Sequence, residues 1–149
     1  MPKTQFKDLD FHFSIEIVKN IPTELKNEFK VVLSAIDKEL INYYFELKKE
    51  PKINYLICIE DNQIGYSSIF EDDKYWNLYE IYIKEEFREL GLGTRLFQLI
   101  KKDSQKEDKQ VRTYTLPSDR RAKNFYESNM ITARVLLMEE KRSRSRYKI

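Results

Sequence analysis

The most informative stretch of the chain is YEIYIKEEFRELGLGTRLF, residues 79–97. Its first part reads as a strand that ends near Ile83, and a helix is predicted to begin at Gly91 and Gly93, two of the three glycines in the chain. The first N–H groups of a helix lack an internal partner, and the helix dipole favours negative charge there. Glycine lets the backbone approach a ligand closely, and Arg88 adds a positive charge. The stretch therefore predicts a binding loop for a phosphate group.

Two common phosphate-binding loops fit this stretch poorly. A nucleoside-triphosphate loop ends in Gly-Lys-Ser/Thr, whereas Thr94 and Arg95 follow Gly93 here. A dinucleotide fingerprint requires glycine or alanine where Leu96 stands. The alternative, a helix start that simply contains two glycines, stays open at this point.

Around this stretch, α and β patterns alternate along the chain. Apolar residues recur every three or four positions from Leu25 to Leu47, which predicts one helix or two. A further helix begins at the glycine pair, and Ser118 or Asp119 is placed to cap a short helix after it. The predicted strands are residues 11–18, 53–60, 64–70, 75–83, 111–116 and 135–140. This order predicts an α/β or α+β fold with helices packed on a mixed sheet.

The composition excludes several classes of protein. The chain has 149 residues, of which 41% are apolar, and this suits one domain with a buried core. A single cysteine, Cys58, lies in an apolar run, which indicates a reducing compartment and a buried side chain rather than a nucleophile. His12 is the only histidine, so no zinc site and no other metal is expected. No membrane-spanning run and no signal-peptide core is present, so we expect a cytoplasmic protein.

The end of the chain differs from the rest. Residues 141–149, KRSRSRYKI, contain five basic and no acidic residues. We therefore expect residues 1–140 to form a single domain and residues 141–149 to form a basic tail. Such a tail either contacts phosphates, including those of a nucleic acid, or is a solvated chain end.

Three motifs, in order along the chain, resemble those of the GNAT-type N-acetyltransferases. RELGLG, residues 88–93, is similar to the Q/R-x-x-G-x-G/A signature of that family, which follows a strand. LYEIYI, residues 78–83, resembles its L-x-E/D-I-Y-V strand. DRRAKNFYE, residues 119–127, resembles its N-x-x-A-x-x-F-Y-E helix. The resemblance extends over about residues 11–140.

The resemblance implies a GNAT-like fold with a mixed, mostly antiparallel sheet flanked by helices. In that fold, strands 79–83 and 111–116 splay apart to admit acetyl-CoA, the implied co-substrate. Its pyrophosphate would bind the loop at residues 88–93, and its pantetheine arm would pair with the first of the two strands. The residues implied in binding are Ile81, Tyr82, Ile83, Arg88, Glu89, Leu90, Gly91, Leu92, Gly93, Thr94, Asp119 and Phe125.

The implied reaction is direct transfer of the acetyl group to a primary amine in a ternary complex. An amine with a pKa of about 10 must lose a proton before it attacks. Glu80 is the candidate base; the alternatives are an anchor for the substrate ammonium group and an ordinary strand residue. Tyr126 stands where the family has a tyrosine acid, which protonates the leaving thiolate; the alternative is a core aromatic residue.

The chain departs from the family pattern at three places. Asp119 replaces an asparagine and brings a negative charge near the cofactor. Met130 replaces the usual glycine after the tyrosine helix, so that turn differs. Glu89 and Leu90 stand beside Arg88, where glycine is common. Contacts from the main chain to a phosphate survive these changes.

The sequence leaves the acceptor open among a polyamine, a peptide or protein amine and a small metabolite. Acidic side chains in the acceptor regions suit a cation, although 35% of all residues are charged. These acids are Asp37, Glu39, Glu46, Glu71, Asp72, Asp73 and Glu80, and the candidate aromatic lining residues are Tyr43, Tyr44, Tyr75 and Trp76.

Two other kinds of function stay open beside catalysis. One is a non-catalytic acyl-CoA-binding sensor or partner-docking module. The other is an acetyltransferase that its basic tail carries to RNA. No membrane contact is expected, and a homodimer is compatible with a protein of this size.

Overall fold

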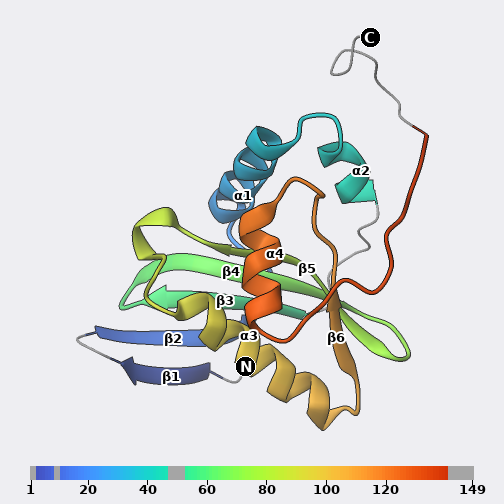
Figure 1. Cartoon of the computed structure of the whole chain (residues 1–149). Helices are drawn as coiled ribbons and strands as arrows, with labels where there is room; N and C mark the ends of the chain where they lie inside the picture. Colours follow the sequence, from blue (N-terminus) through green and yellow to red (C-terminus); the bar gives the residue numbers. More distant parts are fainter. Residues whose placement is uncertain (1–2, 9–10, 47–52, 141–149) are drawn as a thin grey trace.

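The computed structural model describes residues 3–8, 11–46 and 53–140. Six strands form one sheet in these residues, with helices packed on it (Figure 1). The strands are β1 (Lys3–Asp8), β2 (Phe11–Val18), β3 (Ile53–Ile59), β4 (Asn62–Glu71), β5 (Tyr75–Ile83) and β6 (Gln110–Thr113). The helices are α1 (Thr23–Ile36), α2 (Ile41–Glu46), the short 3-10 helix η1 (Glu85–Phe87), α3 (Leu92–Lys106) and α4 (Arg120–Ser128).

The strands lie in the sheet in their chain order, from β1 to β6. The pairings from β1 to β5 are antiparallel, and β6 pairs parallel to β5. This confirms the mixed, mostly antiparallel sheet that the sequence predicts. The parallel pair requires a crossover, which α3 supplies.

The strands differ from the sequence predictions at three places. Residues 135–140 form no strand, because the apolar run has the propensity but no ladder partner in the described chain. The strand β1 was not predicted, because KTQFKD contains one apolar residue and gives no alternation; pairing with β2 forms it. Residues 114–116 also leave the sheet, so β6 is shorter than the pattern indicates. The proposed basic tail, residues 141–149, lies outside the described residues.

Hydrophobic cores lie on both faces of the sheet. Alternation along β3 sends Tyr55 and Ile57 to one face and Leu56 to the other. Helices α3 and α4 cover the first face, where Leu96 and Ile100 are fully buried. Helices α1 and α2 cover the second face (Figure 1). Because helices cover both faces of β5, six of its nine residues are buried.

A β-bulge in β5 decides which face its central residues meet. Ser68 pairs with Glu80 and Ile69 pairs with Leu78, so Tyr79 is the extra residue. In a regular strand residues 78 and 80 share a face. Because of the bulge, Leu78 packs in the core under α3, whereas Glu80 reaches Tyr66 in the core under α1.

The pairing of β5 with β6 stops after four residues, at Leu78 and Thr113. The hydroxyl of Thr113 donates a 2.7 Å hydrogen bond to the Leu78 carbonyl, which closes this ladder. Beyond it, residues 79–83 have no partner on β6, so the splayed strand pair that the family resemblance implies is present. A mixed sheet that opens at this point exposes main-chain groups of β5 toward the gap.

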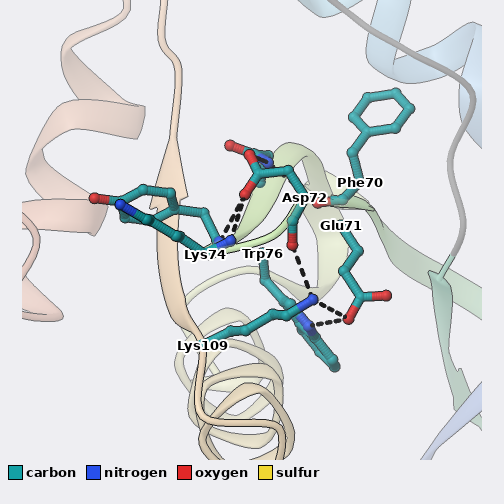
Figure 2. Close-up of polar contacts among 8 residues, drawn as sticks. Phe70, Glu71, Asp72, Lys74, Trp76 and Lys109 are labelled. Carbon is teal, nitrogen blue, oxygen red and sulfur yellow. Dashed lines mark hydrogen bonds and ion pairs between the residues drawn. The ribbon is translucent and has the colours of Figure 1, made fainter.

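A polar network holds the opposite, closed end of this strand pair (Figure 2). The ammonium group of Lys109 donates to Glu71 Oε2 at 2.9 Å and to the Asp72 carbonyl at 2.8 Å. The indole of Trp76 donates to the same Glu71 oxygen at 3.3 Å, and Arg112 lies 3.2 Å from Asp72 Oδ2. These contacts tie the β4–β5 turn to the start of β6.

Candidate active site

A cavity of about 50 Å³ lies where β5 and β6 stop pairing. Its walls come from helices on both faces of the sheet, α1 and α2 on one and α4 on the other, with β5 and the segment after β6 between them. The lining residues are Phe29, Leu33, Tyr44, Tyr79, Ile81, Tyr114, Thr115, Leu116, Asp119, Ala122 and Tyr126. The opening in the sheet therefore contains a small, partly enclosed space with mostly apolar and aromatic walls.

Tyr126 on α4 is one of the residues that line this cavity. Its side chain is 5% exposed and packs against Phe97 and Phe125. Burial raises the pKa of Tyr126 above its ordinary value; a hydrogen bond with Thr113 lowers it, and the charge of Asp119 raises it further. The phenol therefore stays protonated through the neutral pH range, as a proton donor must.

Tyr44 on α2 reaches the same cavity from the other face. Its buried hydroxyl donates a hydrogen bond to the Tyr79 carbonyl, which the bulge takes out of the ladder. Burial raises the pKa of Tyr44, and the nearby Tyr126 and Glu80 raise it further. Helical spacing favours a core position for Tyr44, but the structure makes it a cavity residue as well. The side chain of Tyr43 lies outside the described part.

Glu80, the candidate base, is 2% exposed. The hydroxyl of Tyr66 donates a 2.6 Å hydrogen bond to Glu80 Oε1, and burial together with the charge of Glu80 raises the pKa of Tyr66. The bulge thus turns a carboxylate toward the α1 side of the sheet, next to the opening. Glu80 does not itself line the cavity, although the flanking residues Tyr79 and Ile81 do.

The predicted phosphate loop lies at the end of β5. Gly91 caps α3 with φ 77°, no side chain caps this helix end, and a Cβ there would meet nothing within 4 Å. Glu89 has φ 68°, a backbone conformation that favours glycine. The turn therefore forms with glutamate at a position where glycine is usual. The helix start is therefore open to an anion.

Arg88 is held beside this loop by two contacts. Its Nε donates a 2.8 Å hydrogen bond to the Ile83 carbonyl, and its guanidinium lies 5.6 Å from the centre of the Tyr82 ring. The hydroxyl of Tyr82 points elsewhere, to Glu28 Oε1 at 3.0 Å. Positive charge therefore lies where strand β5 ends, before the open helix start.

The loop and the cavity are connected through α4. A Cβ on Gly93 would lie 3.2 Å from Phe125 Cε1, so glycine allows the Phe125 ring to pack on the start of α3. The next residue, Tyr126, lines the cavity. Asp119 lines it too, and its Oδ1 accepts a 3.0 Å hydrogen bond from the Ala122 N–H, as a helix cap. Leu92 is buried, so only its main chain faces the loop.

Several acceptor candidates have structural roles instead. Asp37 Oδ1 accepts from the N–H groups of Glu39 and Leu40 and so turns the chain into α2. Trp76 is buried in the core, and Arg112 lies 4.2 Å above the Tyr75 ring. Glu71 and Asp72 belong to the network at the closed end of the strand pair, away from the cavity lining.

An open groove of about 490 Å³ runs along α1 and has acidic and apolar walls. It is lined by Glu24, Asn27, Glu28, Val31, Val32 and Tyr82. Lys84 lies 3.7 Å from Glu24 and 3.6 Å from Glu28. The described residues contain no group of three potential metal ligands and no helix able to cross a bilayer.

The fold and these residues agree with a comparison of the sequence with known families. The chain belongs to the acetyltransferase (GNAT) family, whose model matches residues 19–130. It is accordingly an acyltransferase. No curated protein matches the sequence.

Solved structures share the fold at low sequence identity. A putative acetyl transferase from Pyrococcus furiosus is 18% identical, with a TM-score of 0.68 over 87% of this chain and 99% of its own. The aminoglycoside N-acetyltransferase AAC(6')-Iy in complex with CoA is 10% identical, with a TM-score of 0.60 over 93% of this chain and 100% of its own. A GNAT family acetyltransferase from Elizabethkingia anophelis with acetyl-CoA bound is 20% identical, with a TM-score of 0.58 over 78% of this chain and 74% of its own.

Proposed function

We propose that this protein transfers the acetyl group of acetyl-CoA to a primary amine, with both substrates bound together. The observation that carries the proposal is the opening between β5 and β6, whose cavity is lined by the buried Tyr126 and which has the open start of α3 nearby. Family members in complex with CoA and acetyl-CoA have the same fold, which supports the choice of co-substrate.

The residues present fit this co-substrate. A pyrophosphate suits the uncapped start of α3, since the N–H groups there and the dipole favour an anion. Arg88, held beside Tyr82, supplies the balancing charge. The main chain of Ile81, Tyr82 and Ile83 has no partner on β6, so an amide-containing arm can pair with it as an added strand, except at the Ile83 carbonyl, which accepts the hydrogen bond from Arg88 Nε.

Two side chains are assigned to the proton transfers. Glu80 takes a proton from the acceptor ammonium group, through water, because its carboxylate lies next to the cavity rather than in its wall. Tyr126 gives a proton to the leaving thiolate, and its raised pKa keeps that proton available. Main-chain N–H groups in the open part of β5 would stabilise negative charge on the acetyl oxygen.

The acceptor is proposed to be a cationic amine. The α1 groove has two acids, Glu24 and Glu28, and one base beside them, Lys84, next to the apolar Val31 and Val32. The remaining negative charge suits an amine carried on an apolar chain. Two similar solved structures are aminoglycoside acetyltransferases, so aminoglycosides join polyamines and peptide amines as candidates.

The test is release of CoA thiol from acetyl-CoA, measured with and without a panel of amines. The panel contains polyamines, aminoglycosides, free amino acids, peptides with a free N-terminus and a lysine-rich protein. Amine-dependent release is expected, and it should fall by at least about tenfold in Tyr126→Phe and by about a hundredfold in Glu80→Gln. Tyr75→Phe is the control, since this tyrosine lies at the closed end of the strand pair.

The outcomes separate the parts of the proposal. Amine-dependent release that Tyr126→Phe leaves unchanged keeps the activity but removes Tyr126 as the acid. Binding of acetyl-CoA without release for any amine in the panel would argue against the proposal and for a binding-only role.

A further inference from the structure

Arg88 has a positive charge that the described part of the chain does not neutralise. Its side chain is partly buried, and its Nε donates a 2.8 Å hydrogen bond to the Ile83 carbonyl. Among the described residues, no acidic side chain forms an ion pair with Arg88, and no group accepts a hydrogen bond from its Nη1 or Nη2. A partly buried guanidinium in this state is available to an anionic ligand.

The aromatic ring of Tyr82 lies beside this guanidinium. Arg88 Cζ is 5.6 Å from the centre of the ring, which is within the range of a cation–π interaction. An aromatic face attracts a cation but carries no net charge. Tyr82 therefore attracts Arg88 and leaves both its charge and its terminal N–H groups for a ligand.

Tyr82 is itself held firmly in place. It is 7% exposed, and the centre of its ring lies 6.1 Å from that of Phe29 and 6.4 Å from that of Tyr66. Its hydroxyl donates a 3.0 Å hydrogen bond to Glu28 Oε1. Burial and this hydrogen bond raise the pKa of Tyr82 to about 12, so the ring stays neutral at physiological pH.

The acids of α1 near this ring are paired with Lys84 instead of Arg88. Lys84 Nζ lies 3.6 Å from Glu28 Oε2 and 3.7 Å from Glu24 Oε1. Because Lys84 offsets their charge, the pull of these carboxylates on Arg88 is reduced. The arrangement therefore keeps Arg88 on the Tyr82 ring.

We propose that Tyr82 is a positioning residue for acetyl-CoA, whose ring holds the Arg88 guanidinium ready for the pyrophosphate. The inference rests on the co-substrate in the proposed function, but it concerns binding alone and does not depend on acetyl transfer. A free arginine side chain loses rotamer freedom when it binds a phosphate, and holding it beforehand avoids part of that cost. The feature that acts is the face of the ring, not the hydroxyl group.

Calorimetric titration with CoA tests the role of the ring. Tyr82→Leu is expected to raise the dissociation constant for CoA about three- to tenfold, whereas Tyr82→Phe keeps the ring and should stay within about twofold of the wild type. Tyr55→Leu is the matched control. Tyr55 is also buried and donates to a carboxylate, that of Asp103, but no described cation lies over its ring. Its replacement should leave the affinity for CoA unchanged.

Two further measurements separate positioning from a general effect on the fold. In a chain that carries Arg88→Ala, Tyr82→Leu should cause no additional loss of CoA affinity, because the ring acts through the guanidinium. Phenylalanines with one, two or three ring fluorines at position 82 keep the shape of the ring but weaken its attraction for a cation, so they guard against a folding defect in Tyr82→Leu. The affinity for CoA is expected to fall stepwise with the number of fluorines.

The outcomes are distinct. Equal losses of affinity in Tyr82→Leu and Tyr82→Phe, or an affinity that does not change with fluorination, would overturn the positioning role. A loss of the same size in Tyr55→Leu would overturn it too. A wild type that does not bind CoA would refute the role together with the proposed co-substrate. If the expected pattern of CoA binding is found but no amine is acetylated, the role of Tyr82 is supported and only the proposed reaction fails.

Discussion

The hydroxyl of Tyr44 on α2 donates a hydrogen bond to the main-chain carbonyl of Tyr79 in the β5 bulge. This contact joins a six-residue helix to the strand residue that follows the last β5–β6 pair. The Tyr79 ring in turn stacks on Tyr114, with ring centres 4.8 Å apart, on the other arm of the opening. Through Tyr79, these two contacts connect α2 to the bulge and the bulge to the segment on the other side of the opening.

Replacing Tyr44 by phenylalanine is expected to destabilise the protein. The change leaves the Tyr79 carbonyl without its donor in a buried place, and an unsatisfied buried acceptor costs about 1–3 kcal/mol. The free energy of unfolding from urea titration measures the loss. Tyr75→Phe should lower the free energy of unfolding by less than half as much. Equal losses in the two variants would show that the hydrogen bond of Tyr44 does not stabilise the fold.

The stability of the fold at low pH should depend on Asp72, which lies at the closed end of the β5–β6 pair. Hydrogen bonds from Asn77 and from the N–H groups of Lys74 and Tyr75, with Arg112 nearby, lower the pKa of Asp72 from its ordinary 3.8 to about 2. A carboxyl group whose pKa is lower in the folded than in the unfolded state stabilises the fold above the unfolded pKa. That contribution is lost as the pH falls toward the folded pKa.

The stability difference between the wild type and Asp72→Asn is therefore expected to be constant above about pH 5 and to shrink between about pH 4 and pH 2. Urea titrations at a series of pH values measure this difference. Asp73→Asn removes the same charge from the exposed neighbouring residue and serves as the control. A pH-independent difference for Asp72→Asn would contradict the assignment.

Replacing Met130 by glycine is expected to stabilise the protein by up to about 1 kcal/mol. Helix α4 ends with the N–H of Ile131 bonded to the Tyr126 carbonyl and that of Met130 bonded to the Glu127 carbonyl. This is a Schellman motif, and Met130 holds its left-handed position with φ 68°. The Met130 side chain is exposed, so its loss removes little packing.

Thermal or urea unfolding of Met130→Gly and Met130→Ala measures this effect. Alanine removes the same side chain but keeps the steric cost of positive φ, so it should not stabilise the fold. Equal stabilities of the two variants would show that the left-handed backbone stores no strain.

Gly65→Ala is expected to destabilise the sheet by about 1–3 kcal/mol. A Cβ on Gly65 would lie 2.6 Å from the Tyr82 carbonyl oxygen and 2.7 Å from Ile83 Cδ1, so the β4 and β5 backbones must move apart. Gly93→Ala is the control, because its 3.2 Å contact is with the Phe125 ring, which can shift. Urea titration of both variants measures the free energy of unfolding. A larger loss of stability in Gly93→Ala than in Gly65→Ala would contradict the steric argument.

Local patterns in the sequence located several elements well. The strand predicted at residues 75–83 is β5, because this stretch is rich in aromatic and β-branched residues. The strand predicted at 11–18 is β2, because this stretch alternates between apolar and polar residues. Helix α3 begins at the predicted glycine pair, and Asp119, one of the two residues predicted to cap α4, is its N-cap. These features depend on residues within a few positions of one another, so the sequence contains the information directly.

Other features have no local signal. The strand at 135–140 was wrong because a strand exists only with a partner, and the described part of the chain supplies none. The strand β1 was missed because only its pairing with β2 makes it a strand. The role of Tyr44 at the cavity was not distinguishable from a core position, because it depends on where β5 lies relative to α2.

The sequence by itself determined the helix start at the glycine pair, the order of the elements from β2 to α4 and the tyrosine on α4, because glycines, caps and apolar periodicity act over short distances. The tertiary structure alone decided the bulge that turns Glu80 toward Tyr66, the place where β5 and β6 separate, and the meeting of Tyr44 with Tyr79. Each of these depends on contacts between residues 14 to 35 positions apart, whose geometry only the packed sheet and helices define.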